Sequence, residues 1–163
     1  MTVMHMRIDN RLIHGQVTIA WVGTLGANHL IVSNDEVAAD EMQRIILPQA
    51  ARGVKTSILS VADTLAYCAA EQARDERIFV IAKLPADALA LVEGGLQPQE
   101  INVGNQAPRG GKDFKMVTRS IAATPADAAT YRAIASKGFE LKQRMMPGDR
   151  PNDFIKLLAE KHL

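Results

Sequence analysis

Short apolar runs alternate with helical patterns along this chain, and the alternation limits the folds that it can adopt. Runs of strand length occupy residues 3–8, 30–32, 56–59, 78–82 and 101–103, with further candidates at 116–122 and 139–144. Strands that alternate with helices pack as a parallel sheet with right-handed crossovers. We therefore predict an α/β fold: a single three-layer domain over residues 1–163, with a mainly parallel sheet of about six to seven strands and helices on both faces.

The helices are predicted from apolar spacing and from capping residues. They are expected at about 16–25, 34–51, 60–73, 85–92, 125–136 and 151–161. Trp21 and Cys68 fall at helical spacing among apolar neighbours, so both are expected in the core. In the second helix the stripe expected to face the core consists of Val37, Ala38, Met42, Ile45 and Ile46.

Composition excludes several classes of protein. The chain has 163 residues with 19 basic and 18 acidic side chains, a formal net charge of +1, which does not suit bulk binding to nucleic acid or to an anionic membrane. One cysteine cannot form an internal disulfide. No stretch approaches the roughly 20 apolar residues of a membrane span. We expect a cytoplasmic protein with no nucleic-acid partner, whose membrane role, if any, depends on another protein.

The run RIDNRLIHGQV, residues 7–17, follows the first strand and gathers groups suited to phosphate. If Gln16 opens a helix, His14 stands at the end of a strand and the start of a helix, where α/β sheets bind ligands and free N–H groups favour anions. Arg11 adds a planar fork of donors, and His14 supplies a nitrogen nucleophile near neutral pH. With the backbone N–H groups of Gly15 and Gln16, these groups indicate phosphoryl transfer through a phosphohistidine.

Other interpretations of these residues stay open at this point. A histidine in such a turn can simply cap a helix, an arginine there can simply be solvated, and spacing alone favours neither interpretation. Asp9 is either a group that orients the loop or the imidazole of His14, or a turn former. Because the C-terminal ends of parallel strands share one edge, Asp35, Gly104 and Asn105 are candidates for the rim of the site.

A polar loop at 104–115 is long enough to suggest a role in contact or function. A locally basic stretch within and just beyond it consists of Arg109, Lys112, Lys115 and Arg119. It is either a docking surface for an acidic phosphoprotein or a solvated loop. The remaining histidines have no clamp nearby that matches the one at His14 and are expected to be structural: His5, His29 and His162.

Motifs of several enzyme classes are absent from the sequence. There is no GxGxxG after the first strand, no GxxxxGK[ST], no HExxH and no CxxC, so we expect no cofactor and no metal. A histidine phosphatase places arginine directly before its histidine, and here Ile13 holds that position. The alternative that remains is a non-catalytic sensor module that binds a phosphorylated metabolite at the same anion site.

The run at 7–17 resembles the active-site loop of the IIB components of the mannose, fructose and sorbose family of the bacterial sugar phosphotransferase system, which typically reads RIDDRLIHGQV. Asn10 departs from that pattern, where an acidic residue is usual. The resemblance extends through NDEVA at 34–38 and INVGN at 101–105 and covers nearly the whole chain. It implies that His14 carries the phosphoryl group and that Arg11 lies beside it.

The resemblance also implies partners and a reaction. The donor would be a IIA phosphoprotein on a separate chain, and the phosphoryl group would pass to a sugar taken up by a membrane IIC/IID permease. The implied activity is that of a protein-N(pi)-phosphohistidine–sugar phosphotransferase, cytoplasmic and peripherally associated with the permease. The segments WVGTLGAN at 21–28 and INVGN favour an amino sugar such as N-acetylgalactosamine.

Overall fold

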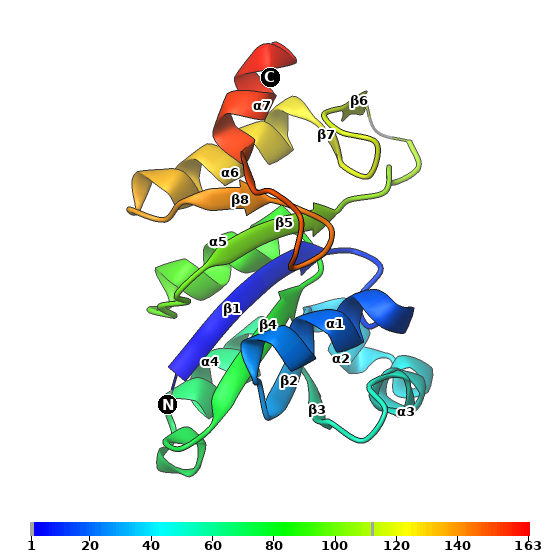
Figure 1. Ribbon diagram of the computed structural model, residues 1–163, viewed down its shortest axis with the longest axis vertical. Helices are drawn as coiled ribbons and strands as arrows, with labels where there is room; N and C mark the ends of the chain where they lie inside the picture. Colours follow the sequence, from blue (N-terminus) through cyan, green and yellow to red (C-terminus); the bar gives the residue numbers. More distant parts are fainter. Residues whose placement is uncertain (1, 112) are drawn as a thin grey trace.

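The computed structural model describes residues 2–111 and 113–163, and its main element is a seven-stranded sheet (Figure 1). The strand order is β3-β2-β4-β1-β5-β8-β9, and all neighbouring pairs are parallel except β8 and β9. The strands are β1 (Thr2–Asp9), β2 (His29–Ser33), β3 (Lys55–Leu59), β4 (Arg77–Ala82), β5 (Ile101–Asn105), β8 (Leu141–Gln143) and β9 (Asn152–Asp153). This arrangement confirms the predicted α/β class and its mainly parallel sheet.

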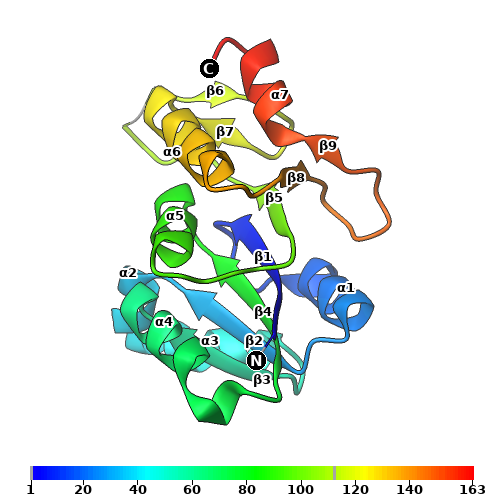
Figure 2. The same cartoon turned by 90° about the vertical axis from the view of Figure 1, so that its left-hand side faces the viewer.

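Helices cover both faces of the sheet, as predicted. Figure 2 shows α1 on one side and α4 and α5 on the other. The helices are α1 (Gly15–Leu25), α2 (Asp35–Ala39), α3 (Glu41–Ala50), α4 (Val61–Ala69), α5 (Pro85–Glu93), α6 (Pro125–Ser136) and α7 (Phe154–Glu160), with a short 3-10 helix at Glu71–Ala73. None of the helices in the described ranges is long and apolar enough to cross a membrane.

Two hydrophobic clusters lie on opposite faces of the sheet, because side chains alternate along each strand. In β4, for example, Val80 belongs to one cluster and Phe79 to the other. Cys68 of α4 lies in the cluster of Val80 and is 4% exposed, whereas Trp21 of α1 lies in the cluster of Phe79 and is 1% exposed. Both residues are in the core, as the sequence predicted.

The predicted helix at 34–51 is in fact two helices, and its proposed inner stripe is wrong beyond the first of them. The Asp40 carboxylate accepts hydrogen bonds from the backbone N–H groups of Met42 and Gln43 and so caps a new helix, α3. Residues of α2 and α3 therefore do not share one helical face. Val37 is buried, but exposed fractions are 69% for Met42, 64% for Ile45 and 53% for Ile46.

Other differences from the prediction lie in the C-terminal third. The candidate strand at 116–122 is a small separate hairpin, in which β6 (Lys115–Met116) pairs with β7 (Ala122–Ala123). The last helix begins at Phe154 rather than near 151, because β9 pairs with β8 before it and the side chain of Asp153 caps it. The helix predicted to reach residue 73 ends as an α-helix at Ala69.

The exposed position of α3 leads to a stability prediction. Ile45→Ala should change the free energy of unfolding by no more than about 0.5 kcal/mol, since an exposed side chain loses little packing. Ile81→Ala, in the middle of β4, should lower it by about 2–5 kcal/mol because it leaves a cavity in the core. Urea unfolding of the two variants measures both values. A similar loss in both would show that Ile45 is packed against the sheet.

Candidate functional site

The loop between β1 and α1 is held by its own apolar residues. Leu12 and Ile13 are each 5% exposed and pack in the cluster below α1. Leu12 adopts a φ of 63° and Gly15 a φ of 44°, left-handed values that turn the chain sharply from strand to helix. With Leu12 and Ile13 buried, the side chains of Arg11 and His14 stay partly exposed, at 38% and 24%.

His14 occupies the N-cap position of α1. Its Nδ1 lies 2.9 Å from the carbonyl oxygen of Leu12, which can only accept, so Nδ1 donates in this geometry. Its Nε2 is buried, has no hydrogen-bond partner among the described residues and lies 4.0 Å from Oδ2 of Asp9. The backbone N–H groups of Gly15 and Gln16 begin the helix beside it, and both residues are exposed. Such N–H groups lack partners within a helix and attract anions.

Asp9 holds the loop through hydrogen bonds of its buried carboxylate. It is fully buried, its Oδ2 accepts from Nε of Arg7 at 3.0 Å, and its Oδ1 accepts from the backbone N–H of Arg11 at 3.0 Å. Nε of Arg11 is 3.5 Å from the same Oδ1. The carboxylate thus fixes both the loop backbone and the direction of the Arg11 side chain. Asp9 is therefore placed as a turn former and loop organiser, and its Oδ2 lies 4.0 Å from Nε2 of His14 without a hydrogen bond.

Arg7 is a site residue that sequence analysis missed. Its side chain is 2% exposed and also donates to Oδ1 of Asn102 and, at 3.2 Å, to the carbonyl of Arg144. The available signal was a charged residue inside an apolar strand, because a buried arginine needs acceptors. Gly104 makes room for it: a Cβ at Gly104 would lie 2.1 Å from Cζ of Arg7.

The end of β5 meets the loop through Asn105, one of the candidate rim residues. The backbone N–H of Asn10 donates to the carbonyl of Asn105 at 3.1 Å, and the Asn105 side-chain amide lies 3.2 Å from Oδ1 of Asn10. Asn10 also exchanges two 3.0 Å hydrogen bonds with the backbone of Ala107. An aspartate could not make the donating half of that exchange. Asn10 therefore joins the loop to the segment after β5.

Three of the other candidate rim and docking residues bond to partners within the fold. Asp35 follows β2 at the same edge of the sheet, but β4 lies between β2 and β1. Oδ1 of Asp35 accepts a hydrogen bond from the backbone N–H of Val61 at 2.9 Å. Arg109 forms an ion pair with Asp127 at 3.1 Å. Nζ of Lys115 donates to the backbone carbonyl of Lys161, directly after α7, at 2.9 Å. Arg119 is exposed. Lys112 lies outside the described residues.

Two of the remaining histidines are enclosed by partners, in keeping with structural roles. His5 is 1% exposed and stacks on Trp21 with ring centroids 4.6 Å apart. Burial lowers the pKa of His5 to about 4, although Glu100 acts in the opposite direction. His29 bonds to Glu76 through Nδ1 at 2.7 Å and to Ser57 through Nε2 at 2.9 Å.

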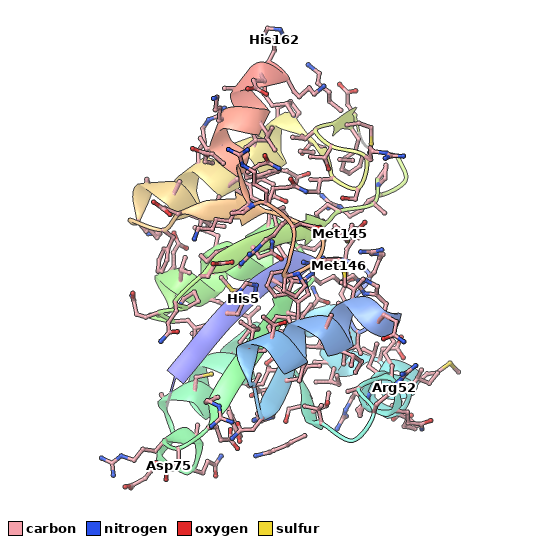
Figure 3. All side chains as sticks on the ribbon, viewed as in Figure 1. His5, Arg52, Asp75, Met145, Met146 and His162 are labelled. Carbon is pink, nitrogen blue, oxygen red and sulfur yellow. The ribbon has the colours of Figure 1, made fainter. Side chains whose placement is uncertain are left out.

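A segment between β8 and β9, which we call the strap (residues 144–149), lies over the site and was not foreseen. Nε1 of Trp21 donates to the carbonyl of Met145 at 2.9 Å. The sulfur of Met145 accepts from Nη2 of Arg7 at 3.6 Å and from Nη2 of Arg11 at 3.4 Å. Figure 3 shows Met145 and Met146 above α1 near the end of β1.

These groups together make a site for an anion beside a nucleophile. The imidazole, the Arg11 guanidinium and the free N–H groups of α1 converge where β1 ends, so the site can hold a phosphoryl group on nitrogen and neutralise its charge. In the part of the chain that is described, no three His, Cys, Asp or Glu side chains gather as a metal site.

Comparison with known proteins connects this geometry to one family. The family model of the PTS system sorbose subfamily IIB component matches residues 3–163. The chain is 36% identical over 150 residues to the sorbose-specific EIIB component of Klebsiella pneumoniae, covering 91% of this chain and 90% of that protein. It is 36% identical over 156 residues to the N-acetylgalactosamine-specific phosphotransferase enzyme IIB component 2 of Escherichia coli, covering 93% and 96%. The crystal structure of the IIBSor domain of the sorbose permease from Klebsiella pneumoniae matches with a TM-score of 0.93 at 34% identity, over 98% of both chains.

The lowered pKa of His5 predicts a pH-dependent stability. Its pKa falls from 6.5 to about 4 on folding, so the unfolded chain binds the proton more tightly and stability should decline by about 3 kcal/mol as pH drops through that window. In His5→Phe, which keeps an aromatic ring on Trp21 but does not titrate, the decline between pH 6.5 and 4 should be shallower by that amount. Urea unfolding across this range tests it, and equal slopes in both proteins would contradict it.

Proposed function

Because the chain belongs to the sorbose subfamily of IIB components of the phosphotransferase system, we propose that it carries the phosphoryl group on His14. The observation that carries this proposal is the position of the ring: a partly exposed imidazole at the N-terminus of α1, on the same short loop as Arg11. A helix N-terminus and a guanidinium favour a phosphoryl group bound there. The sensor alternative is not favoured, since the similar proteins are phosphotransferase components.

The attacking nitrogen in this proposal is Nδ1. Nε2 of His14 is buried and faces Asp9, so a bulky phosphorus centre cannot reach it in line. In the reactive tautomer the proton sits on Nε2, and Nδ1 leaves the Leu12 carbonyl to attack. The new N–P bond forms as the donor's bond to phosphorus breaks. The Asp9 carboxylate, 4.0 Å from Nε2, stabilises the positive charge that develops on the ring.

The phosphoryl oxygens would be held by donors that are already in place. A guanidinium has five N–H donors, so Arg11 retains donors beyond those directed at Asp9 and Met145. The N–H groups of Gly15 and Gln16 supply the rest. Fixed donors of this kind stabilise the charge that spreads over the oxygens in the transition state without reorganisation.

The partners and the location follow from the same proposal. Residues 1–163 would act as one IIB unit that accepts the phosphoryl group from a IIA phosphoprotein on a separate chain. It would pass the group to a sugar at a membrane IIC/IID permease, as a cytoplasmic protein that associates peripherally with the membrane. The activity would be that of a protein-N(pi)-phosphohistidine–sugar phosphotransferase. The family membership and the small formal net charge of +1 support this assignment.

Among sugars, N-acetylgalactosamine is the first candidate. The segments at 21–28 and 101–105 favour it, and one similar protein bears that specificity in its name. Another similar protein, equally identical, is named for sorbose. Uptake assays with a matched permease and the two sugars would separate these candidates.

Phosphorylation should map to His14. With phosphoenolpyruvate, the general phosphotransferase proteins and a IIA protein of this family, the wild type should gain an acid-labile, base-stable phosphate on the peptide that contains His14. His14→Ala should gain none, whereas the exposed His162→Ala should behave as wild type. Arg11→Ala should slow phosphorylation about 100-fold, the usual cost of removing one donor to a developing anion.

The same experiment can refute the proposal. A phosphate on another residue, or full labelling of His14→Ala, would exclude His14 as the carrier. Failure to label the wild type, together with equal binding of a phosphorylated sugar to the wild type and to His14→Ala, would restore the sensor interpretation.

A further inference from the structure

The strap brings a thioether to the side chain that clamps the phosphoryl group. The side chain of Met145 accepts a hydrogen bond from Arg11, with 3.4 Å between its sulfur and Nη2. The backbone of Met145 is anchored to α1, because its carbonyl accepts a hydrogen bond from Nε1 of Trp21 at 2.9 Å. Trp21 is itself 1% exposed, so the sulfur is placed by the core of the protein.

The chemistry of this contact distinguishes it from an ordinary anchor. A thioether is a weak acceptor, whereas phosphoryl oxygens are strong, charged acceptors for a guanidinium. Arg11 is held on its other side by Asp9, whose Oδ1 lies 3.5 Å from Nε. One strong acceptor therefore sets the direction of the side chain, and one weak acceptor holds its outer end.

We propose that Met145 is a positioning residue for phosphoryl transfer: its sulfur holds the outer end of Arg11 at the site and yields that donor to the phosphoryl group on His14. This inference rests on the proposed function. Without the sulfur, the outer end of a long side chain that is 38% exposed would be free to rotate. With a stronger acceptor in its place, the donor would be withheld from phosphate.

The second guanidinium at this sulfur does not depend on it in the same way. Nη2 of Arg7 is 3.6 Å from the sulfur. Arg7 is also held by Asp9 at 3.0 Å, by Asn102 and by the Arg144 carbonyl at 3.2 Å. Changes at Met145 should therefore act mainly through Arg11, and a double-mutant cycle can detect that dependence.

The test is the single-turnover rate of phosphoryl transfer from a phosphorylated IIA protein to His14. Met145→Leu, which keeps the volume and removes the acceptor, should lower this rate about fivefold, because Arg11 must then be ordered in the transition state. Met145→Gln, with a stronger acceptor, should lower it about tenfold by competing for the donor. Both effects should disappear in an Arg11→Ala background. A merely structural role for Met145 would slow both backgrounds alike.

Met146→Leu is the matched control. Met146 is the neighbouring strap residue, and its backbone N–H donates to Oδ2 of Asp149 at 2.9 Å. The strap sulfur that Arg11 donates to is that of Met145, not that of Met146. It should transfer at the wild-type rate in both backgrounds, and urea unfolding should show all variants folded. If Met145→Gln folds and Met145→Leu does not, the double-mutant cycle of Met145→Gln with Arg11→Ala tests the inference by itself.

The outcomes separate this inference from the function on which it rests. If the wild type is labelled on His14 but both Met145 variants match Met146→Leu, or slow transfer equally with and without Arg11, the inference about Met145 is wrong and the carrier function stands. If the wild type is not labelled on His14, the proposed function falls and this inference falls with it.

Discussion

The buried ion pair between Arg7 and Asp9 connects every part of the site. Removing both charges from water costs several kcal/mol per ion, and the structure offsets that cost with a full set of partners. Asp9 accepts hydrogen bonds from the Arg7 side chain and from the backbone N–H of Arg11. Arg7 also donates to Asn102 of β5 and to the carbonyl of Arg144. Because each partner belongs to a different segment, the pair fixes the loop, the neighbouring strand and the strap relative to one another.

The chemistry follows from what this pair leaves exposed. With the loop anchored from below by Asp9 and packed through Leu12 and Ile13, the side chains of His14 and Arg11 stay at the surface beside the first turn of α1. A phosphoryl carrier needs that combination: a nucleophile that a second protein can reach, and donors that do not reorganise when charge arrives. Nη2 of Arg11 donates to the sulfur of Met145, which is a weak acceptor, so a stronger acceptor can take over this donor.

Most elements could be predicted from local pattern, and the failures share a physical cause. The strands at β2 to β5 and the helix at α6 were foreseen within a residue or two because each depends on its own apolar spacing and caps. The stripe through Met42 and Ile45 failed because the cap at Asp40 starts a new helix axis. The hairpin of β6 and β7 was predicted as a single strand because a short apolar run does not determine which strand it pairs with.

The sequence by itself determined the class of fold and the position of the loop that carries His14, since alternation, capping and the run from Arg7 to Val17 are local properties. It also placed Gly104 and Asn105 at the sheet edge where β1 ends, because parallel strands end at one edge. Only the tertiary structure decided the roles of Arg7 and Met145. Their partners lie as far as 138 residues away along the chain, and such contacts depend on strand order and on which buried charge finds which acceptor.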